Sequence, residues 1–139
     1  AIFAFFVRLA NFANSEIFGI PTDLPWAVTF LRVDMLPRHP VQLYEAFTFF
    51  GIFVLLVYIY NCSKNIPKGS LLGLFLSLTF VARFLLEYFK ERQASYANEL
   101  ALSVGQLLSI PFIIVGVFLL AFAFSKSLSN HLSDSDTIQ

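Results

Sequence analysis

The chain has 139 residues, of which 58% are hydrophobic and 13% are charged, and its formal net charge is zero. Soluble domains carry about 25% charged residues, so this composition excludes an ordinary soluble domain and indicates an integral membrane protein. The zero net charge gives no basic field for nucleic acid. The single cysteine, Cys62, excludes an intrachain disulfide and a cysteine metal cluster, and we expect a free thiol in a short loop.

Residues 1–7 are apolar and are typical of the end of a membrane helix that starts upstream. Arg8, Asn11 and Ser15 follow at spacings of three and four, so on a helix they would form one polar stripe. Gly19, which precedes Ile-Pro, is expected to stop that helix. An arginine at this depth either extends to the lipid head groups or faces a polar pocket; the residues leave both possibilities open.

Residues 21–40 predict an ordered interfacial loop, with several prolines and with Trp26 as an aromatic anchor. Within it, residues 27–33 fit a short strand or a segment lying in the membrane plane. Pro37 and Pro40 then hold the chain extended, because proline fixes its own φ and keeps the preceding residue out of the helical region.

Three segments have the length and apolar character of membrane spans, at about residues 41–60, 71–89 and 104–124. The serine- and aspartate-rich residues 125–139 are expected to form a disordered polar tail. The sequence therefore predicts an all-α integral membrane protein whose membrane domain covers residues 1–124, with three complete spans and the end of a fourth.

Counting spans puts the loops at residues 19–40 and 90–100 on one side of the membrane, together with most of the polar side chains. This group comprises Arg8, Arg38, His39, Gln42, Tyr44, Glu45, Arg83 and Glu87. The same side carries most Lys and Arg residues, which by the positive-inside rule would make it cytoplasmic. Arginines that bind an anionic ligand are not free topology signals, so the residues alone leave the orientation open.

The chemistry of this group suits an anionic lipid. The guanidinium groups of Arg8 and Arg83 can each pair with two phosphate oxygens and can stabilise charge on a departing phosphate. Arg83 could instead form a structural ion pair with Glu87, four residues on. His39 is either a general base or an interfacial loop histidine. The two histidines of the chain do not make a typical zinc site, so we expect no metal.

Four blocks of the chain resemble, in the right order, sequence blocks of the prolipoprotein diacylglyceryl transferase family. They are residues 8–19 with 22–27, residues 38–46, residues 83–89 and residues 105–111. Arg8, Asn11, Glu16 and Gly19 match signature positions, and Arg83 matches the second essential arginine of the family. The resemblance extends from Arg8 to about Phe124, and four ordered blocks are far more specific than one motif.

The resemblance implies a bacterial plasma (inner) membrane enzyme with seven membrane helices, whose site faces the outer, periplasmic side. It implies transfer of the diacylglyceryl group of phosphatidylglycerol to the lipobox cysteine of a prolipoprotein signal peptide, forming a thioether and releasing glycerol phosphate. This is the first step of bacterial lipoprotein maturation, and no cofactor is expected. By this resemblance the chain corresponds to about the C-terminal half of the family's proteins.

On this reading Arg83 and His39 are the expected catalytic residues. The expected substrate-binding residues are Arg8, Asn11, Glu16, Gly19, Arg38, Gln42, Tyr44, Glu45 and Glu87. The chain departs from the family where glycines are usual, at Val7, Ala10 and Ser15, and where a tyrosine is common, at Thr79. The histidine proposed as the family's base lies upstream and has no counterpart in this chain.

Two functions of other classes fit the same residues. A transporter or channel subunit could use the arginines to select anions, and a non-catalytic scaffold could bind phospholipid without turnover. The polar groups cluster at one membrane face and leave the middle of the spans apolar, which argues against a conduction path.

Overall fold

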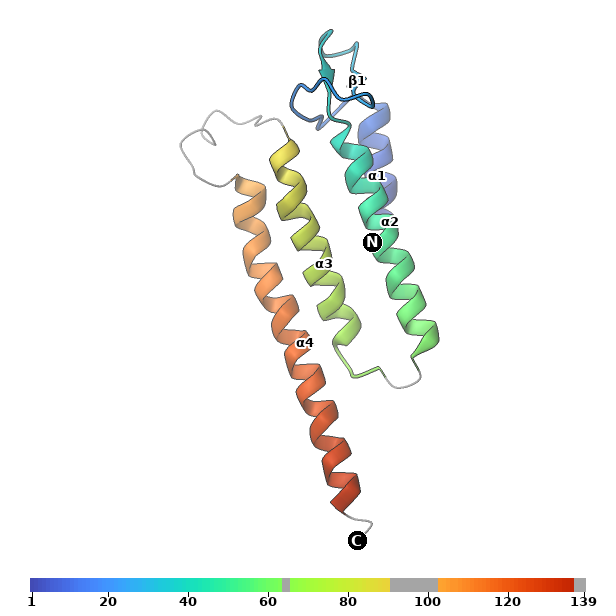
Figure 1. Ribbon diagram of the computed structural model, residues 1–139, viewed down its shortest axis with the longest axis vertical. Helices are drawn as coiled ribbons and strands as arrows, with labels where there is room; N and C mark the ends of the chain where they lie inside the picture. The colour runs from blue at the N-terminus through green and yellow to red at the C-terminus, as the bar shows by residue number, and fades with distance from the viewer. Residues whose placement is uncertain (64–65, 91–102, 137–139) are drawn as a thin grey trace.

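The computed structural model describes residues 1–63, 66–90 and 103–136, with residues 127–136 described for their backbone only. The chain is mostly helical, and its helices run side by side with a loop-rich cap at one end (Figure 1). The elements in order are α1 (Ile2–Ala13), β1 (Val28–Thr29), β2 (Pro37–Arg38), α2 (Val41–Cys62), α3 (Ser70–Leu86), the 3-10 turn η1 (Glu87–Phe89) and α4 (Val104–Asp136).

Among the described residues, three helical segments are long and apolar enough to cross a membrane: Val41–Cys62, Ser70–Phe89 and Val104–Lys126. Large apolar side chains point outward along them, such as Phe47 and Phe118, which are 67% and 66% exposed. A helix that is apolar all round needs a lipid or protein environment on every face. The predicted fold class, a helical membrane protein with three spans, is confirmed.

Helices α3 and α4 approach each other closely through small residues. A Cβ atom at Gly73 would lie 2.8 Å from the backbone oxygen of Gly116, and one at Gly116 would lie 2.6 Å from Ser77 Oγ. Small residues let membrane helices approach at backbone distance. Nearer the loop end, the rings of Phe80 and Phe112 stack with centroids 4.4 Å apart, so this helix pair forms a firm unit.

The first helix ends earlier than the polar stripe predicts. Asn14 caps α1, and Ser15 and Ile17 adopt left-handed backbone angles, with φ of 59° and 55°. These angles break the helical path, so Ser15 lies outside the helix that carries Arg8 and Asn11. The expectation that Gly19 stops this helix is also wrong, because the helix has already ended six residues earlier, at Ala13.

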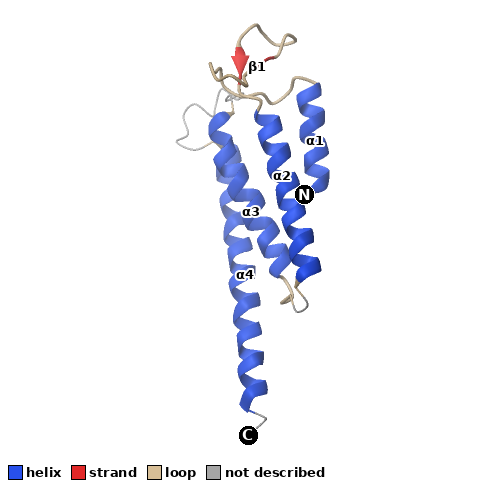
Figure 2. Cartoon of the chain, turned by 45° about the vertical axis from the view of Figure 1, so that its right-hand side comes forward, coloured by secondary structure: helices blue, strands red, loops and turns tan. Residues whose placement is uncertain are grey.

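The loop after α1 connects two parts of the helical bundle. Val28–Thr29 pairs antiparallel with Pro37–Arg38, a short strand pair in the cap drawn in Figure 2. Earlier in the loop, the Gly19 N–H donates to the His39 carbonyl at 3.0 Å, and the Ile20 N–H donates to the Phe89 carbonyl at 3.0 Å. The loop backbone therefore joins the start of α2 to the end of α3.

The last helix is longer than expected. It continues to Asp136, through residues for which the sequence predicts a disordered tail, while residues 137–139 lie outside the described part. The reason is that no glycine or proline follows Gly116 to stop the helix. The expected polar loop at residues 90–100 falls almost wholly outside the described residues.

Candidate functional site

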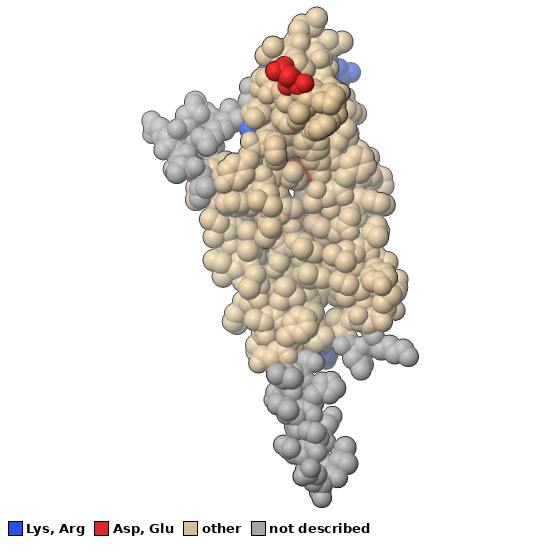
Figure 3. All heavy atoms as spheres, viewed as in Figure 1, with Lys and Arg blue, Asp and Glu red and all other residues tan. Residues whose placement is uncertain are grey.

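The ends of α1 and α3 and the starts of α2 and α4 meet at the loop end of the bundle (Figure 1). On the face drawn in Figure 3, charged atoms gather mainly toward this end, and the helical wall below it is largely uncharged. The polar side chains that the sequence places on one membrane side therefore do occur together. The contacts between them define the site.

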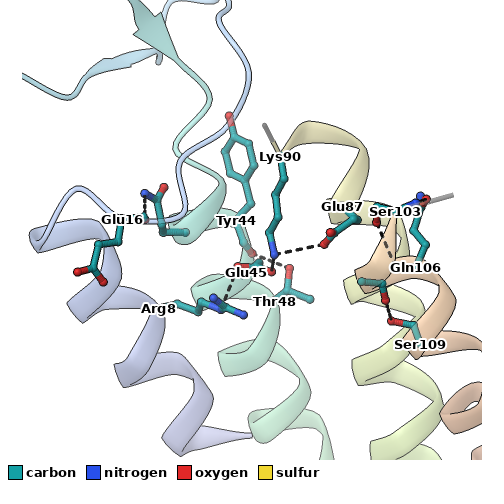
Figure 4. A network of polar contacts seen from close by, with 12 residues as sticks. Arg8, Glu16, Tyr44, Glu45, Thr48, Glu87, Lys90, Ser103, Gln106 and Ser109 are labelled. Atoms are coloured by element: carbon teal, nitrogen blue, oxygen red, sulfur yellow. Dashed lines mark hydrogen bonds and ion pairs between the residues drawn. The ribbon is translucent and has the colours of Figure 1, made fainter. Parts of the chain in front are cut away.

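Glu45 is the centre of the site. It lies in the second turn of α2 and is 0% exposed. Its Oε2 atom is 2.9 Å from Arg8 Nε, and its Oε1 atom is 2.8 Å from Lys90 Nζ (Figure 4). Arg8 comes from α1 and Lys90 follows η1, so one carboxylate joins three parts of the chain. A buried carboxylate without such partners would be strongly destabilising.

Glu87 extends the network on the far side of Lys90. Its Oε2 atom is 3.4 Å from Lys90 Nζ. The alternative expected from the sequence, an ion pair between Arg83 and Glu87, does not occur, since the cation near Glu87 is Lys90. Arg8 and Lys90 balance Glu45 and Glu87 in formal charge. Arg83 lies one turn before Glu87 and adds a further positive charge to this end of α3.

Arg83 differs from the other cations of the site. Its Nε atom is buried and has no hydrogen-bond partner in the structure, and no ion pair joins Arg83 to another described residue. Buried guanidinium groups normally have partners, because an unpaired buried charge is costly. Arg83 can therefore donate a hydrogen bond to an added anion.

Arg38 stabilises the loop. Its Nε atom donates to Asp34 Oδ2 at 3.2 Å, its Nη1 donates to the Gly19 carbonyl at 3.2 Å, and its guanidinium carbon lies 4.8 Å from the centre of the Phe18 ring. The hydrogen bonds from Arg38 hold the pKa of the Asp34 carboxyl group below its usual value. These contacts fix the loop above the site.

Gln42 and Glu45 share the buried face of α2, as their spacing predicts, and both are 0% exposed. Gln42 Nε2 donates to the backbone carbonyl of Glu16 at 2.7 Å. The Glu16 side chain itself is exposed and lies apart from the Arg8–Glu45 pair (Figure 4). Asn11 accepts a hydrogen bond from the Glu16 N–H at its backbone carbonyl, at 2.9 Å. Here Glu16 and Asn11 contribute backbone atoms.

Aromatic side chains surround His39. The Trp26 indole N–H donates to the Tyr44 phenolic oxygen at 2.8 Å, and this oxygen is 3.2 Å from His39 Nδ1. The Phe89 ring lies 5.3 Å from the His39 ring. Gly19 allows the loop to pass this close, because a Cβ atom there would lie 2.7 Å from both His39 Cβ and the His39 carbonyl oxygen.

The start of α4 is fixed by a reciprocal cap. The Gln106 N–H donates to Ser103 Oγ at 3.2 Å, and the Ser103 N–H donates to Gln106 Oε1 at 3.0 Å, which is the capping-box arrangement. Gln106 Nε2 also donates to the Phe84 carbonyl, at 3.4 Å. The cap therefore ties the start of α4 to the last turn of α3 and sets Gly105 beside Glu87.

The sequence does not predict two residues of the site. It places Lys90 in a loop, although Lys90 follows Glu87 by three residues, a spacing that suits an ion pair. It shows Gly105 only as part of a motif block. Its tight position against Glu87 depends on packing between α3 and α4, which no local pattern reveals. Among the described residues, no group of three or more His, Cys, Asp or Glu side chains could hold a metal ion.

Comparison with known proteins agrees with the sequence blocks. A family model described as prolipoprotein diacylglyceryl transferase matches residues 1–122. The chain belongs to this family. Members named phosphatidylglycerol–prolipoprotein diacylglyceryl transferase include one from Tolumonas auensis, 55% identical over 83% of this chain and 45% of the relative.

Two further relatives with the same name give the same picture. The one from Chloroherpeton thalassium is 56% identical over 82% of this chain and 43% of the relative. The one from Bacteroides fragilis is 49% identical over 90% of this chain and 46% of the relative. The chain thus spans a little under half the length of these relatives, and the described network lies within the matched region.

Proposed function

We propose that this chain belongs to a transferase that moves the diacylglyceryl group of phosphatidylglycerol to the lipobox cysteine of a prolipoprotein signal peptide. The observation that carries the proposal is the buried Arg8–Glu45–Lys90 network at the loop end of the bundle, within the family match over residues 1–122. Buried cations at the end of apolar spans suit a substrate with an anionic head group and lipid tails.

The reaction is a substitution at the glyceryl carbon that carries the phosphate. The cysteine sulfur forms a bond to this carbon, the bond from the carbon to the phosphate oxygen breaks, and glycerol phosphate leaves with the electron pair. The thiol proton must go to a base, because a free thiol has a pKa of about 8.5. The leaving phosphate needs nearby positive charge. His39 is the candidate proton acceptor in this chain.

Arg8 is the proposed ligand of the lipid phosphate. Its nearest contact with Glu45 is through Nε, and among the described residues its terminal amino groups have no hydrogen-bond partner. Those two groups can bind two phosphate oxygens at once. The proposed role of Glu45 is to orient the guanidinium group from the opposite side.

Arg83 is the proposed group that stabilises the leaving phosphate, because its buried Nε lacks a partner. The remaining expected site residues would shape and orient the pocket rather than react. They are Asn11, Glu16, Gly19, Arg38, Gln42, Tyr44 and Glu87.

In this proposal the protein lies in the bacterial plasma (inner) membrane with the site toward the outer, periplasmic side. By the positive-inside rule, the excess of cations at the loop end would indicate a cytoplasmic side. Several of these cations are paired, which weakens that indication. Arg8 and Lys90 pair with Glu45, and Arg38 pairs with Asp34. Cations neutralised in this way are weak topology signals.

The test uses the protein at its native full length in phosphatidylglycerol vesicles, with a lipobox peptide whose mass is followed. The proposal predicts a gain of one diacylglyceryl group, which is lost when the peptide cysteine is changed to serine. An unchanged peptide mass, with folded protein present, would overturn the proposal. Anion flux across the vesicles would then support a transporter, and phosphatidylglycerol binding without turnover would support a scaffold.

A further inference from the structure

We infer that Lys90 is a positioning residue that keeps the terminal amino groups of Arg8 available for an anionic lipid head group. This inference rests on the role proposed above for Arg8. It concerns a residue outside the sequence blocks that carry the family resemblance, and it follows from how the two oxygens of Glu45 are shared.

Glu45 gives one oxygen to each cation. Its Oε2 lies 2.9 Å from Arg8 Nε and its Oε1 lies 2.8 Å from Lys90 Nζ. An arginine and a carboxylate that are left alone tend to form a two-point pair, in which two guanidinium nitrogens bind both oxygens. Lys90 occupies the second oxygen, and the nearest approach of Arg8 to Glu45 is through Nε (Figure 4). Among the described residues, the outer nitrogens of Arg8 make no hydrogen bond.

The position of Lys90 is set by the fold. Its backbone forms an antiparallel bridge with Gly19, and the neighbouring Phe89 carbonyl accepts a hydrogen bond from the Ile20 N–H at 3.0 Å. Its side chain is 12% exposed and also approaches Glu87, at 3.4 Å. The loop that follows α1 therefore holds Lys90 in place beside Glu45.

Loss of the lysine charge would act in two ways on phosphate binding, and both weaken it. Glu45 would be left with Arg8 as its cation among the described residues, so the carboxylate would draw Arg8 into a two-point pair. The site would also carry one positive charge fewer, and a buried charge difference acts strongly on a bound anion. Removing the charge of Glu45 at the same time would take away the carboxylate that draws Arg8 aside and would restore the formal charge of the site.

The first measurement is the affinity of the full-length protein for phosphatidylglycerol in detergent micelles, for wild type, Lys90→Met and Lys90→Arg. Lys90→Met should raise the dissociation constant about tenfold, equivalent to about 1.4 kcal/mol, and Lys90→Arg should stay within about threefold of wild type. The matched control is Lys68→Met, an exposed lysine in the turn at the opposite end of the bundle.

The deciding comparison is the double variant Glu45→Gln/Lys90→Met. The inference predicts that it binds phosphatidylglycerol at least about threefold more tightly than Lys90→Met, because no carboxylate remains to draw Arg8 away from the head group. It is overturned if Lys90→Met binds as tightly as wild type, or if the double variant binds as weakly as Lys90→Met. If Lys90→Met does not fold, Lys90→Gln replaces it in both the single and the double variant.

The binding readout needs no turnover, so it separates this inference from the proposed function. A protein that binds phosphatidylglycerol in a Lys90-dependent way but leaves the peptide mass unchanged would refute the transferase and retain the inference. In an active enzyme, Lys90→Met should raise KM for phosphatidylglycerol while kcat changes less than about twofold, the pattern of lost ground-state binding.

Discussion

Gly105 lies directly against the carboxylate of Glu87. A Cβ atom at position 105 would come within 2.5 Å of Glu87 Oε1 and 2.7 Å of Oε2. The capping box formed by Ser103 and Gln106 fixes this turn of α4, so the helix cannot easily move back. A methyl group at this position would therefore force the Glu87 carboxylate, the end of a flexible side chain, to shift from its place beside Lys90.

Gly105→Ala should displace Glu87 and weaken its contact with Lys90. We expect a stability loss of up to about 1 kcal/mol, because the flexible Glu87 side chain can move aside and loses its contact with Lys90, measured by thermal unfolding in detergent. Gly51→Ala is the matched control, because Gly51 lies in α2 with no atom within 4 Å of the added Cβ. The control should be neutral or gain up to about 1 kcal/mol. Equal melting temperatures for the two variants would refute this packing.

Tyr44 joins Trp26 to His39 through one phenolic oxygen. Trp26 can only donate, so its N–H uses an acceptor position of the oxygen, and the Tyr44 O–H can donate to His39 Nδ1. Tyr44→Phe removes both contacts and should lower stability by about 1–2 kcal/mol. Tyr58→Phe, on the exposed face of α2, should leave the melting temperature unchanged. A similar effect of the two variants would argue against the contact.

The same hydrogen bond bears on the role of His39. A proton acceptor needs a free ring nitrogen, so in this role Nδ1–H donates to the Tyr44 oxygen and Nε2 takes the proton. His39→Gln and His39→Leu both remove that nitrogen, so each should lose about tenfold or more of the activity. A His39→Gln variant that keeps at least about a third of the activity, measured by peptide mass, would contradict the role of His39 as the proton acceptor.

Ser15 adopts a left-handed backbone conformation, with φ of 59°. A left-handed backbone is unfavourable by about 1–2 kcal/mol for a residue with a side chain. Ser15→Gly should therefore raise stability by about 1 kcal/mol, measured by thermal unfolding. Ser15→Ala keeps the Cβ atom and serves as the control. No gain from glycine would mean that this turn is not strained.

The loop should respond to acid through Asp34. Hydrogen bonds from Arg38 lower its pKa below the usual 3.8, so the unfolded chain binds a proton more readily than the folded one. This contribution to stability is present above pH 3.8 and is lost as the pH falls through the lowered pKa. Thermal unfolding followed by Trp26 fluorescence should show a steeper loss below about pH 4 in wild type than in Asp34→Asn. Equal slopes would contradict the pairing.

The three spans were predictable because long apolar segments have few alternatives in lipid. The grouping of Arg8, Glu45 and Glu87 at one end was also predictable, since it follows from counting spans. The shared buried face of Gln42 and Glu45 follows from helical spacing. These features depend on local pattern and on chain direction, both of which are visible in the sequence.

The partners within the site were not predictable. Glu87 pairs with Lys90 rather than Arg83 for two reasons. The 3-10 turn η1 brings side chains three residues apart into line, and the Gly19–Lys90 bridge fixes the lysine backbone. The two-residue strands are too short to give an alternating pattern. The end of α1 depends on the left-handed Ser15, a residue that rarely adopts this conformation.

The most direct test of the account is the rate at which the full-length protein adds diacylglyceryl to a lipobox peptide, compared for wild type, Arg83→Gln and Arg32→Gln. Arg32 is an exposed loop arginine and serves as the matched control. The account predicts a mass gain of one diacylglyceryl group with wild type and with Arg32→Gln, and a kcat about 10²-fold lower for Arg83→Gln. An unmodified peptide with wild type, or equal rates for all three proteins, would contradict it.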